Sequence, residues 1–386
     1  MRKETKVGII TKYSPPLKTV HDIVANLKQT FPVLLVEIRA EELRTKKSVG
    51  LSKVDLPSGI PTYHMWDGSS VDRLLANVPA FKHKNFEQAI LKHNISVLHA
   101  QFAALGYDAL NLKKKFNLPL IVHCRGEDVF RDVPKDRGKT QRLRSLFRNS
   151  DLLLTVSEHM RQHLINLGCP EEKVLTHYQG IDLSLFKPNG DKNIDKDDEI
   201  RVVMCGRFTE KKGFEDGIKA FALCARKRKN VKLQIIGDGP LKKRIGQEIS
   251  SLRINEKVEL LGQQSPQQVA QILSEGHIFM MAYITPKDKD TEGVPNVLKE
   301  ASSSGLPVIS TYHGGIPEVV ISGETGFLLK ETDINGISER LKHLIENPEM
   351  RKRFGENGRR LIEVKFDLSK QIEKLEEIYL SLRNGQ

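Results

Sequence analysis

The sequence predicts an α/β protein made of two domains, each built on a parallel sheet. A chain of 386 residues is longer than one ordinary hydrophobic core requires, so we expect two domains of similar size. Short runs rich in strand-forming residues, such as 7–11, 200–205 and 277–284, alternate with predicted helices. Strands and helices in alternation are the pattern of parallel α/β folds.

The composition is that of a soluble globular protein. Hydrophobic residues make up 39% of the chain and charged residues 28%, which is close to the ordinary proportion. No run of about 18 apolar residues is present, so we expect no membrane-spanning helix. The charged start of the chain precedes only a short apolar run at 7–10, which we interpret as a strand and not as a signal peptide. We therefore expect a cytoplasmic protein.

The formal net charge of +12 predicts an acidic partner. Anionic lipid, a phosphorylated acceptor and nucleic acid all fit this charge. No zinc finger, recognition helix or RNA-binding motif stands out, so we expect no nucleic acid. The four cysteines lie far apart without a CxxC pair, so we expect neither disulfides nor structural zinc. They are Cys124, Cys169, Cys205 and Cys224.

Apolar runs predict the strands of the first half of the chain. These are 7–11, 33–38, 95–99, 120–123, 151–156 and 173–178. Predicted helices alternate with them at 19–29, 86–93, 107–116 and 157–168, the last capped by a serine and ended by a glycine. Residues 41–60 are polar and are interpreted as a loop.

The second half repeats the alternation. Its predicted strands are 200–205, 231–236, 258–261, 277–284 and 306–310, with helices at 214–227, 265–274 and from Gly293 and Pro295 to Gly305. After Phe327 the pattern is helical, with a break at Pro348. The last predicted helix, 368–382, carries apolar residues at helical spacing.

Two carboxylates flank the predicted helix start after the strand at 277–284. Glu292 ends a charged loop, and Glu300 lies inside the helix, eight residues further on. Eight helical residues rise about 12 Å, which is more than a hydrolytic carboxyl pair needs. The free N–H groups of a helix start suit a phosphate. A nucleotide-diphosphate sugar, with hydroxyls on both sides of a pyrophosphate, fits this order. The alternative is a surface glutamate and a helix glutamate that are solvated or paired with Lys299 or Lys330.

The motif around these acids resembles the signature of glycosyltransferase family 4. It reads EGVPNVLKE at 292–300, ASSSGLPVIST at 301–311, and HGGIPEVV followed by GETGFLL at 313–329. The resemblance is to polysaccharide-biosynthesis members and implies the GT-B fold, with two Rossmann-like domains facing each other across a cleft. It also implies retaining transfer from a nucleotide sugar, with Glu292 contacting the donor sugar and Glu300 the ribose.

The resemblance extends to the basic turn GRFTEKKG at 206–213. Arg207 and Lys212 match the pair with which the family clamps the pyrophosphate leaving group, although an ordinary basic surface turn has the same composition. Gly206 allows close backbone approach, and Gly239 lies in a turn that lines the cleft. The resemblance also implies that the residues at the helix start bind the donor. These are Gly293, Val294, Pro295, Asn296 and Val297.

In the first domain the resemblance points to acceptor or cleft residues at two strand ends. His99 closes one strand, and His123 lies near the end of another. Arg125 stands where the family often has a histidine, and can bind a phosphate or carboxylate with two hydrogen bonds. Asp128 matches the acid of the same family motif and is also expected at the acceptor or the cleft. The alternatives are a histidine that caps a strand, and an ion pair of Arg125 with Asp128 or Glu127.

Three other features depart from the family or mislead. The segment 13–16 reads Tyr-Ser-Pro-Pro where many members carry two glycines, so donor contact by this loop is in doubt. Asp288 and Asp290 match the metal motif of the other major transferase fold, but positive side chains already supply charge here, so we expect no metal. His159 and His163 are interpreted as solvated helix residues.

The segment 125–148 is strongly basic, with three leucine or phenylalanine side chains at helical spacing. Such an amphipathic helix would bind an anionic membrane. The alternative is a solvated helix whose apolar residues pack on the domain.

We therefore expect an acceptor-side domain at 1–188, a linker at 189–198, a nucleotide-sugar-binding domain at 199–365, and a C-terminal helix at 366–386 that packs back on the first domain. The predicted enzyme is a retaining glycosyltransferase of the hexosyltransferase type without a cofactor, for which a UDP-sugar is favoured over a GDP-sugar. A lipid-linked or saccharide acceptor and contact with the cytoplasmic face of a membrane are expected, and the oligomeric state is left open. The alternative is a non-catalytic nucleotide-sugar-binding subunit that supports a partner transferase.

Overall fold

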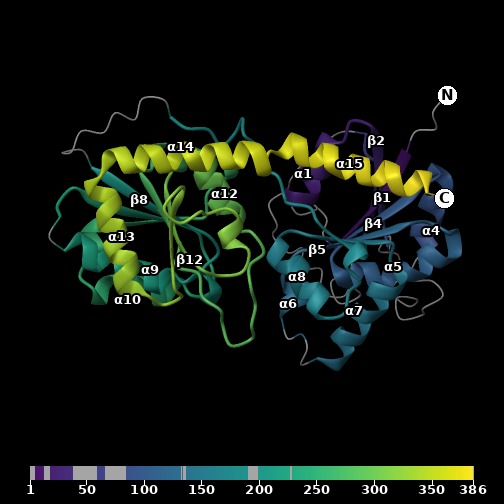
Figure 1. Ribbon diagram of the computed structural model, residues 1–386, viewed down its shortest axis with the longest axis horizontal. Helices are drawn as coiled ribbons and strands as arrows, with labels where there is room; N and C mark the ends of the chain where they lie inside the picture. The colour runs from purple at the N-terminus through teal and green to yellow at the C-terminus, as the bar shows by residue number, and fades with distance from the viewer. Residues whose placement is uncertain are drawn as a thin grey trace. The chain divides into compact units, whose positions relative to one another are not determined.

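The computed structural model describes residues 5–12, 18–37, 59–65, 84–131, 133, 136–189, 199–226 and 228–385. Its contacts divide the chain into two compact units. The first unit contains Met1–Val156, Arg161–His177 and Ser369–Gln386, and the second contains Ser157–Met160 and Tyr178–Leu368. Each unit is an α/β layer structure with one parallel sheet, as predicted (Figure 1).

The sheet of the first unit has the order β3-β2-β1-β4-β5-β6-β7 among the described residues, and all its pairs are parallel. The strands are β1 Thr5–Thr11, β2 Thr30–Val36, β3 Thr62–His64, β4 Val97–Gln101, β5 Leu120–Cys124, β6 Leu152–Thr155 and β7 Val174–Thr176. Strands β4, β5 and β6 are buried on both faces, which is why they are nearly continuous apolar runs. All six predicted strands are present; β3 has only three residues and shows no periodicity.

Helices connect these strands. They are α1 Lys18–Asn26, α4 Lys84–His93, α5 Ala103–Phe116, α6 Glu127–Phe130, α7 Arg137–Asn149 and α8 Glu158–Asn166. On α7 the apolar residues Leu143, Leu146 and Phe147 are buried at 4%, 0% and 3% exposure. The apolar residues of α7 therefore pack on the core of its own unit, as in the alternative interpretation of this basic segment.

The C-terminal helix α15, Leu368–Asn384, contributes to the first unit although it comes last in the sequence. The Oε1 atom of Glu376 accepts hydrogen bonds from the backbone N–H groups of Lys28, Gln29 and Thr30 at 2.9, 2.6 and 2.9 Å, and from the Thr30 hydroxyl at 3.0 Å. Glu376 is 1% exposed. A buried carboxylate on α15 thus accepts the hydrogen bonds of the backbone N–H groups in the turn that leads into β2.

The sheet of the second unit has the order β10-β9-β8-β11-β12-β13, again parallel throughout. The strands are β8 Ile200–Cys205, β9 Val231–Ile236, β10 Val258–Gly262, β11 Ile278–Met280, β12 Val308–Thr311 and β13 Gly326–Leu329. The helices are α9 Phe214–Ala225, α10 Lys242–Ser251, α11 Pro266–Glu275, α12 Asn296–Ser303, α13 Ile334–Glu346 and α14 Pro348–Lys365. Short 3-10 turns include Glu210–Lys212 and Ile316–Glu318.

Three sequence predictions in this unit need correction. The apolar run at 277–284 is a strand only over β11; Met281 N–H still donates to the Ile309 carbonyl at 3.0 Å, and the residues after it lead into the charged loop. The chain after Phe327 is not helical at once, since β13 continues to Leu329 and α13 begins at Ile334. Pro295 is the N-cap of α12 and not a residue of its first turn, because its ψ of 129° is extended.

The Glu376 contact predicts a specific loss of stability. Replacing Glu376 by Ala leaves three backbone donors without their acceptor, and each buried unsatisfied donor costs about 1–3 kcal/mol. We expect Glu376→Ala to lower the free energy of unfolding by about 3 kcal/mol, measured by urea denaturation. Glu377→Ala, an exposed neighbour on the same helix, is the matched control. Equal stability of the two variants would contradict this role.

Candidate functional site

The candidate site lies where three strands of the second sheet end. Gly206 follows β8, the charged loop 285–292 follows β11, and His313 follows β12 shortly after its end. Neighbouring strands of a parallel sheet present their carboxyl ends at the same edge, which is where ligands of open α/β sheets bind. The E-x7-E motif and the basic turn at 206–213 therefore meet at one edge of the sheet, although about 80 residues separate them.

Glu292 is the centre of a cluster of charges. Its Oε1 atom lies 2.9 Å from Lys212 Nζ and 3.3 Å from Lys211 Nζ, and Lys211 Nζ lies 2.9 Å from Asp290 Oδ2. Burial alone would raise the pKa of Glu292, but the ammonium groups of Lys212 and Lys211 lower it to about 2. Glu292 is therefore ionised at neutral pH, and Lys211, whose pKa is raised by its acidic neighbours against the effect of burial, is protonated.

A glycine brings the two lysines to this carboxylate. Lys211 and Lys212 lie in the 3-10 turn that ends at Gly213, which has φ +61°. A Cβ atom on Gly213 would lie 1.7 Å from the Ala282 carbonyl oxygen. The backbone after β8 can therefore lie directly against the backbone after β11, where Ile284 N–H donates to the Lys211 carbonyl at 3.1 Å.

Tyr283 forms the floor beneath Lys212. Its side chain is fully buried, and Lys212 Nζ lies 4.9 Å from its ring centroid, within the range of a cation–π contact. Burial raises the pKa of Tyr283, and the carboxylates of Glu292 and Glu300 add to this effect. Burial also raises the pKa of Cys205 to about 12, with a further contribution from Glu300. Glu300 on α12 thus lies in the same electrostatic environment as Glu292.

The start of α12 lies between the two glutamates. Gly293, Val294 and Pro295 are buried, and Asn296 and Val297 are half-buried. The N-cap Pro295 has no side chain that can accept from the first turn. Because the first N–H groups of a helix have no partner within the helix, this terminus can receive an anionic group.

Arg207 stands at the rim of the same edge. Its side chain is exposed and forms no ion pair with any of the described residues. Gly239 packs against the loop that carries it, since a Cβ atom on Gly239 would lie 2.8 Å from the backbone N and O of Phe208. Arg207 and Lys212 thus lie on one turn, but their charged groups have different surroundings. The guanidinium of Arg207 is exposed, whereas the ammonium of Lys212 contacts Glu292.

Sequence reasoning missed three residues of this site: Lys211, His313 and Glu331. His313 is fully buried; its Nε2 accepts from Glu292 N–H at 3.2 Å, and its Nδ1 lies 2.8 Å from Glu331 Oε1. The only sequence signals for them were the first lysine of the pair at 211–212 and the histidine before Gly314.

The predicted residues of the first unit form a separate buried cluster. The Tyr379 hydroxyl lies 2.6 Å from His99 Nδ1, and the rings of His99 and His123 stack at 5.6 Å. Both ring nitrogens of His123 are buried, and no hydrogen-bond partner is found for them among the described residues. Burial, followed by the nearby charge of Arg125, holds the pKa of both histidines well below the ordinary value. They are neutral at pH 7.

Arg125 and Asp128 do not form the ion pair that the sequence suggested. The Nη2 atom of Arg125 donates to Gln101 Oε1. Asp128 instead accepts backbone hydrogen bonds from Ala103, Arg125 and Gly126 at 2.9–3.0 Å. Asp128 thus has a structural role in joining the loops after β4 and β5, while Arg125 is oriented by a neutral amide.

The remaining sequence candidates lie elsewhere or outside the described residues. Asp290 pairs with Lys211 as given above, and His163 Nε2 lies 3.1 Å from the Val129 carbonyl oxygen. Among the described residues, no group of three or more acidic, histidine or cysteine side chains is arranged to hold a metal ion. The loop at 13–16 and residues 190–198 of the predicted linker lie outside the described residues.

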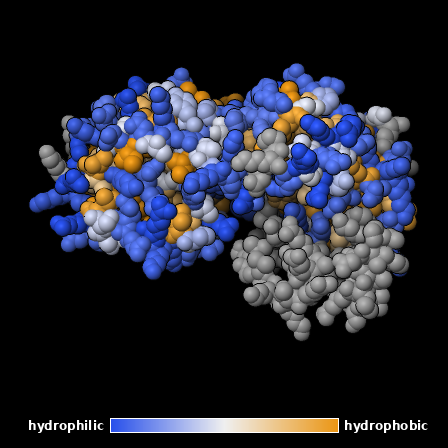
Figure 2. Space-filling view, turned by 90° about the horizontal axis from the view of Figure 1, so that it is seen from below, coloured by the Kyte–Doolittle hydropathy of each residue, from blue (hydrophilic) through white to orange (hydrophobic). Residues whose placement is uncertain are grey.

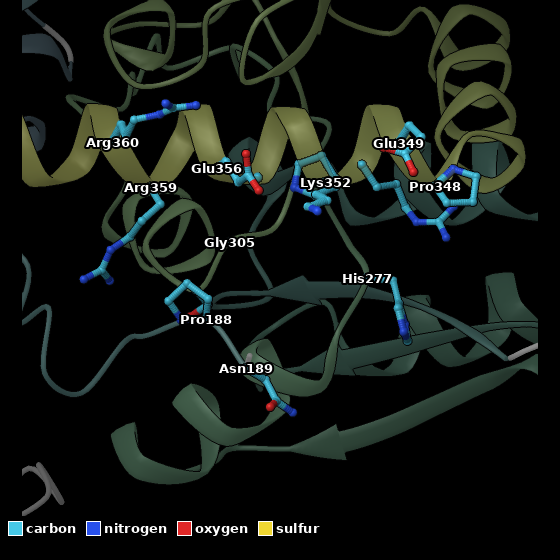
Figure 3. Close-up of a pocket in the computed structure, with 14 residues that line it drawn as sticks. Pro188, Asn189, His277, Gly305, Pro348, Glu349, Lys352, Glu356, Arg359 and Arg360 are labelled. Carbon is cyan, nitrogen blue, oxygen red and sulfur yellow. The ribbon is translucent and has the colours of Figure 1, made fainter. Parts of the chain in front are cut away.

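A pocket of about 630 Å³ lies at the opposite end of the same sheet. Its lining includes His277 and Gly305, which precede β11 and β12, together with Pro188. Figure 3 shows Lys352 and Glu356 extending from α14 toward this pocket. Since its residues precede the strands whereas those of the candidate site follow them, the pocket is separate from the candidate site.

Two family models match the chain. The model "Glycosyltransferase Family 4" matches residues 55–185, and the model "Glycosyl transferases group 1" matches residues 187–361. The putative colanic acid biosynthesis glycosyltransferase WcaL of Escherichia coli is 32% identical over 202 residues, which are 52% of this chain and 49% of WcaL. The chain thus matches about half the length of that relative. The amylovoran biosynthesis glycosyltransferase AmsK of Erwinia amylovora is 27% identical over 308 residues, 79% of this chain and 74% of AmsK.

Solved structures share the fold. The structure of Anabaena Alr3699/HepE in complex with UDP aligns with a TM-score of 0.75 at 17% identity and covers 98% of this chain and 100% of its own. Sucrose-phosphate synthase from Thermosynechococcus elongatus aligns with a TM-score of 0.76 at 18% identity, over 99% of this chain and 100% of its own. The architecture is therefore GT-B. Because the two family models together account for residues 55–185 and 187–361, the chain belongs to the group 1 and family 4 glycosyltransferases.

Proposed function

We propose that the protein transfers a sugar from a nucleotide-diphosphate sugar to an acceptor hydroxyl with retention, in the synthesis of a cell-surface polysaccharide or glycolipid. The observation that carries this proposal is the ionised Glu292, held by two lysines beside the open start of α12. A carboxylate next to an anion-binding helix terminus can accept from sugar hydroxyls while the terminus holds the diphosphate. UDP is favoured as the nucleotide because the neighbour HepE was solved with UDP.

In this mechanism the bond between the anomeric carbon and the diphosphate oxygen breaks, and a bond from the acceptor oxygen to the same carbon forms. The proton of the acceptor hydroxyl passes to the departing phosphate oxygen. Arg207, Lys212 and the start of α12 stabilise the negative charge that develops on the diphosphate. Glu292 orients the sugar, and Glu300 holds the ribose. The neutral histidines of the first unit do not act as the base in this scheme.

The acceptor is proposed to be lipid-linked or saccharide, as in the synthesis of colanic acid or amylovoran for which WcaL and AmsK are named. None of the helices in the described ranges has the length and hydropathy of a membrane span. On the face shown in Figure 2, the described hydrophobic residues are scattered among hydrophilic ones without a broad patch. The membrane contact that we propose is electrostatic and uses the exposed arginines of α7: Arg137, Arg142, Arg144 and Arg148.

A second candidate is a non-catalytic nucleotide-sugar-binding subunit. One observation favours it: Arg125 stands where the family often has a histidine, and its guanidinium donates to Gln101. This candidate predicts donor binding by the purified protein without hydrolysis or transfer. Turnover of any UDP-sugar or GDP-sugar by the purified protein alone would exclude it.

Replacing Glu292 by Gln tests the transferase proposal. The amide keeps the shape of the side chain but loses the charge, so we expect turnover of the preferred nucleotide sugar to fall at least 100-fold. Affinity for the nucleoside diphosphate alone should not fall, because Glu292 is assigned to the sugar and loss of its charge leaves Lys212 free to contact the diphosphate. Calorimetry and a donor-turnover assay measure the two quantities. Glu324→Gln, at an exposed position of the same unit, is the control; full activity of Glu292→Gln would overturn the assignment.

The pKa of Glu292 gives a pH prediction. A carboxyl group with a pKa of about 2 is ionised at every pH above this value, so its charge does not change between pH 5 and 8. We expect the ratio of kcat/KM between the wild-type protein and Glu292→Gln to be constant over this range. A ratio that falls toward 1 below pH 6 would show that Glu292 titrates there.

Vesicle binding tests the electrostatic contact. Each basic residue near an anionic surface contributes about 1 kcal/mol, so Arg144→Gln combined with Arg148→Gln should weaken binding to phosphatidylglycerol vesicles about 30-fold at low salt. Wild-type binding should also fade as salt increases. The control removes two exposed charges from the second unit, Lys243→Gln and Lys342→Gln. If the two double substitutions weaken vesicle binding equally, α7 is not the surface that contacts the membrane.

A further inference from the structure

The charged loop 285–292 is attached to the second unit at both of its ends by one pair of side chains. At its start, Thr285 N–H donates to Glu331 Oε2 at 2.8 Å, and the Thr285 hydroxyl donates to Oε1 at 2.8 Å. At its end, Glu292 N–H donates to His313 Nε2 at 3.2 Å. His313 Nδ1 and Glu331 Oε1, 2.8 Å apart, join the two attachments. A series of hydrogen bonds, Thr285–Glu331–His313–Glu292, therefore joins the two ends of the loop.

The partners of His313 determine which ring nitrogen carries the proton. Nε2 faces a backbone N–H and must be the acceptor, so in the neutral ring the proton lies on Nδ1. Nδ1–H then donates to the Glu331 carboxylate. Burial alone would raise the pKa of Glu331, but the hydrogen bonds from Thr285 and His313 keep it below the ordinary value. Glu331 is therefore an ionised acceptor, which selects the tautomer that can hold Glu292.

The other side of the Glu292 backbone is held by the glycines that follow His313. Gly315 N–H donates to the carbonyls of Glu292 and Gly293 at 3.3 and 2.8 Å. A Cβ atom on Gly314 would lie 2.1 Å from the Glu292 carbonyl oxygen. Both the N–H and the carbonyl of Glu292 are thus bonded to the segment 313–315, so a shift of His313 moves the residue that carries the carboxylate.

His313 also contacts the floor of the charge cluster. Its ring stacks on Tyr283 with the centroids 6.1 Å apart and the planes within 13°. The Lys212 ammonium in turn lies over the Tyr283 ring. The same histidine therefore supports the backbone of Glu292 and the aromatic ring beneath the lysine that pairs with it.

We propose that His313 and Glu331 are positioning residues that hold the Glu292 carboxylate in place for the donor sugar. This inference rests on the proposed function and adds two residues to it. Neither residue contacts the sugar; His313 acts on the Glu292 backbone, and Glu331 acts through the tautomer of His313. A displacement of a reacting or orienting group by about 1 Å can reduce turnover about 100-fold. Even a small shift of Glu292 after loss of one of these hydrogen bonds should therefore be measurable as reduced turnover.

Two substitutions of His313 separate positioning from a general structural role. In His313→Gln the amide oxygen can take the place of Nε2 and accept from Glu292 N–H. In His313→Asn the shorter amide reaches the place of Nδ1, so the contact to Glu331 is kept and the one to Glu292 is lost. We expect turnover of the nucleotide sugar by the Asn variant to be about tenfold below that of the Gln variant. Equal losses in both would overturn the proposal.

Glu331→Gln tests the role of the carboxylate. The amide group of glutamine can donate to Nδ1, which permits the tautomer with a proton on Nε2, and this proton would face Glu292 N–H. We expect affinity for UDP alone to stay within twofold of the wild-type value, while affinity for the UDP-sugar and its turnover fall about tenfold. Glu324→Gln should leave all three unchanged. The ¹⁵N chemical shifts of the His313 ring report the tautomer without any substrate.

The outcomes distinguish this inference from the proposed function. If the wild-type protein neither binds nor turns over any nucleotide sugar, the proposed function fails, whatever the ring of His313 does. If the wild-type protein is active and Glu331→Gln matches it, or loses affinity for UDP and UDP-sugar equally, the positioning role is overturned. A wild-type ¹⁵N spectrum with the His313 proton on Nε2 would overturn it as well.

Discussion

One carboxylate shared by two ammonium groups organises the carboxyl edge of the second sheet. Glu292, Lys212 and Lys211 come from the loops after β11 and β8, and with Asp290, which pairs with Lys211, their charges compensate one another in a site from which water is largely excluded. Removing one member of such a cluster leaves an uncompensated buried charge, which is strongly unfavourable. The arrangement therefore holds the two loops together and keeps Glu292 ionised, so that one interaction serves both the packing of the edge and its proposed chemistry.

Backbone contacts make this ion cluster possible. Gly213 and Gly314 lie where a side chain would collide with the neighbouring loop. The loops after β8, β11 and β12 approach one another through their main chains, and the side chains of Glu292 and Lys212 meet at the carboxyl edge of the sheet. His313 and Glu331 complete the support from the buried side. A site of this kind is precise because its orienting groups are held by neighbours that are themselves bonded.

The first unit is organised differently. Its buried polar groups, the stacked His99 and His123 together with Tyr379, are neutral, and the charge of Arg125 at their edge helps to keep them so. The C-terminal helix α15 closes this unit through Glu376, which bonds the turn before β2. The last residues of the chain therefore belong to the core of the unit that contains the first ones.

The sequence by itself determined the fold class and most of the strands and helices, and it pointed to the motif residues Glu292, Glu300, Arg207 and Lys212, whose roles are proposals. These depend on local periodicity, turn residues and a contiguous motif, all of which can be read along the chain. The strands β3 and β13 were not predicted, because the three half-buried residues of β3 form no apolar run and β13 begins at a glycine directly before the segment interpreted as helical.

Only the tertiary structure decided which side chains meet. The pairing of Lys211 with Glu292 joins residues about 80 positions apart, and the chain from Glu331 through His313 to Glu292 depends on the register of β11, β12 and β13 in one sheet. The same holds for Arg125, whose partner is Gln101 on the neighbouring strand and not the acids beside it in sequence. Long-range contacts follow from strand order and burial, which local sequence patterns do not contain, and therefore the supporting residues of the site appear only once the sheet is assembled.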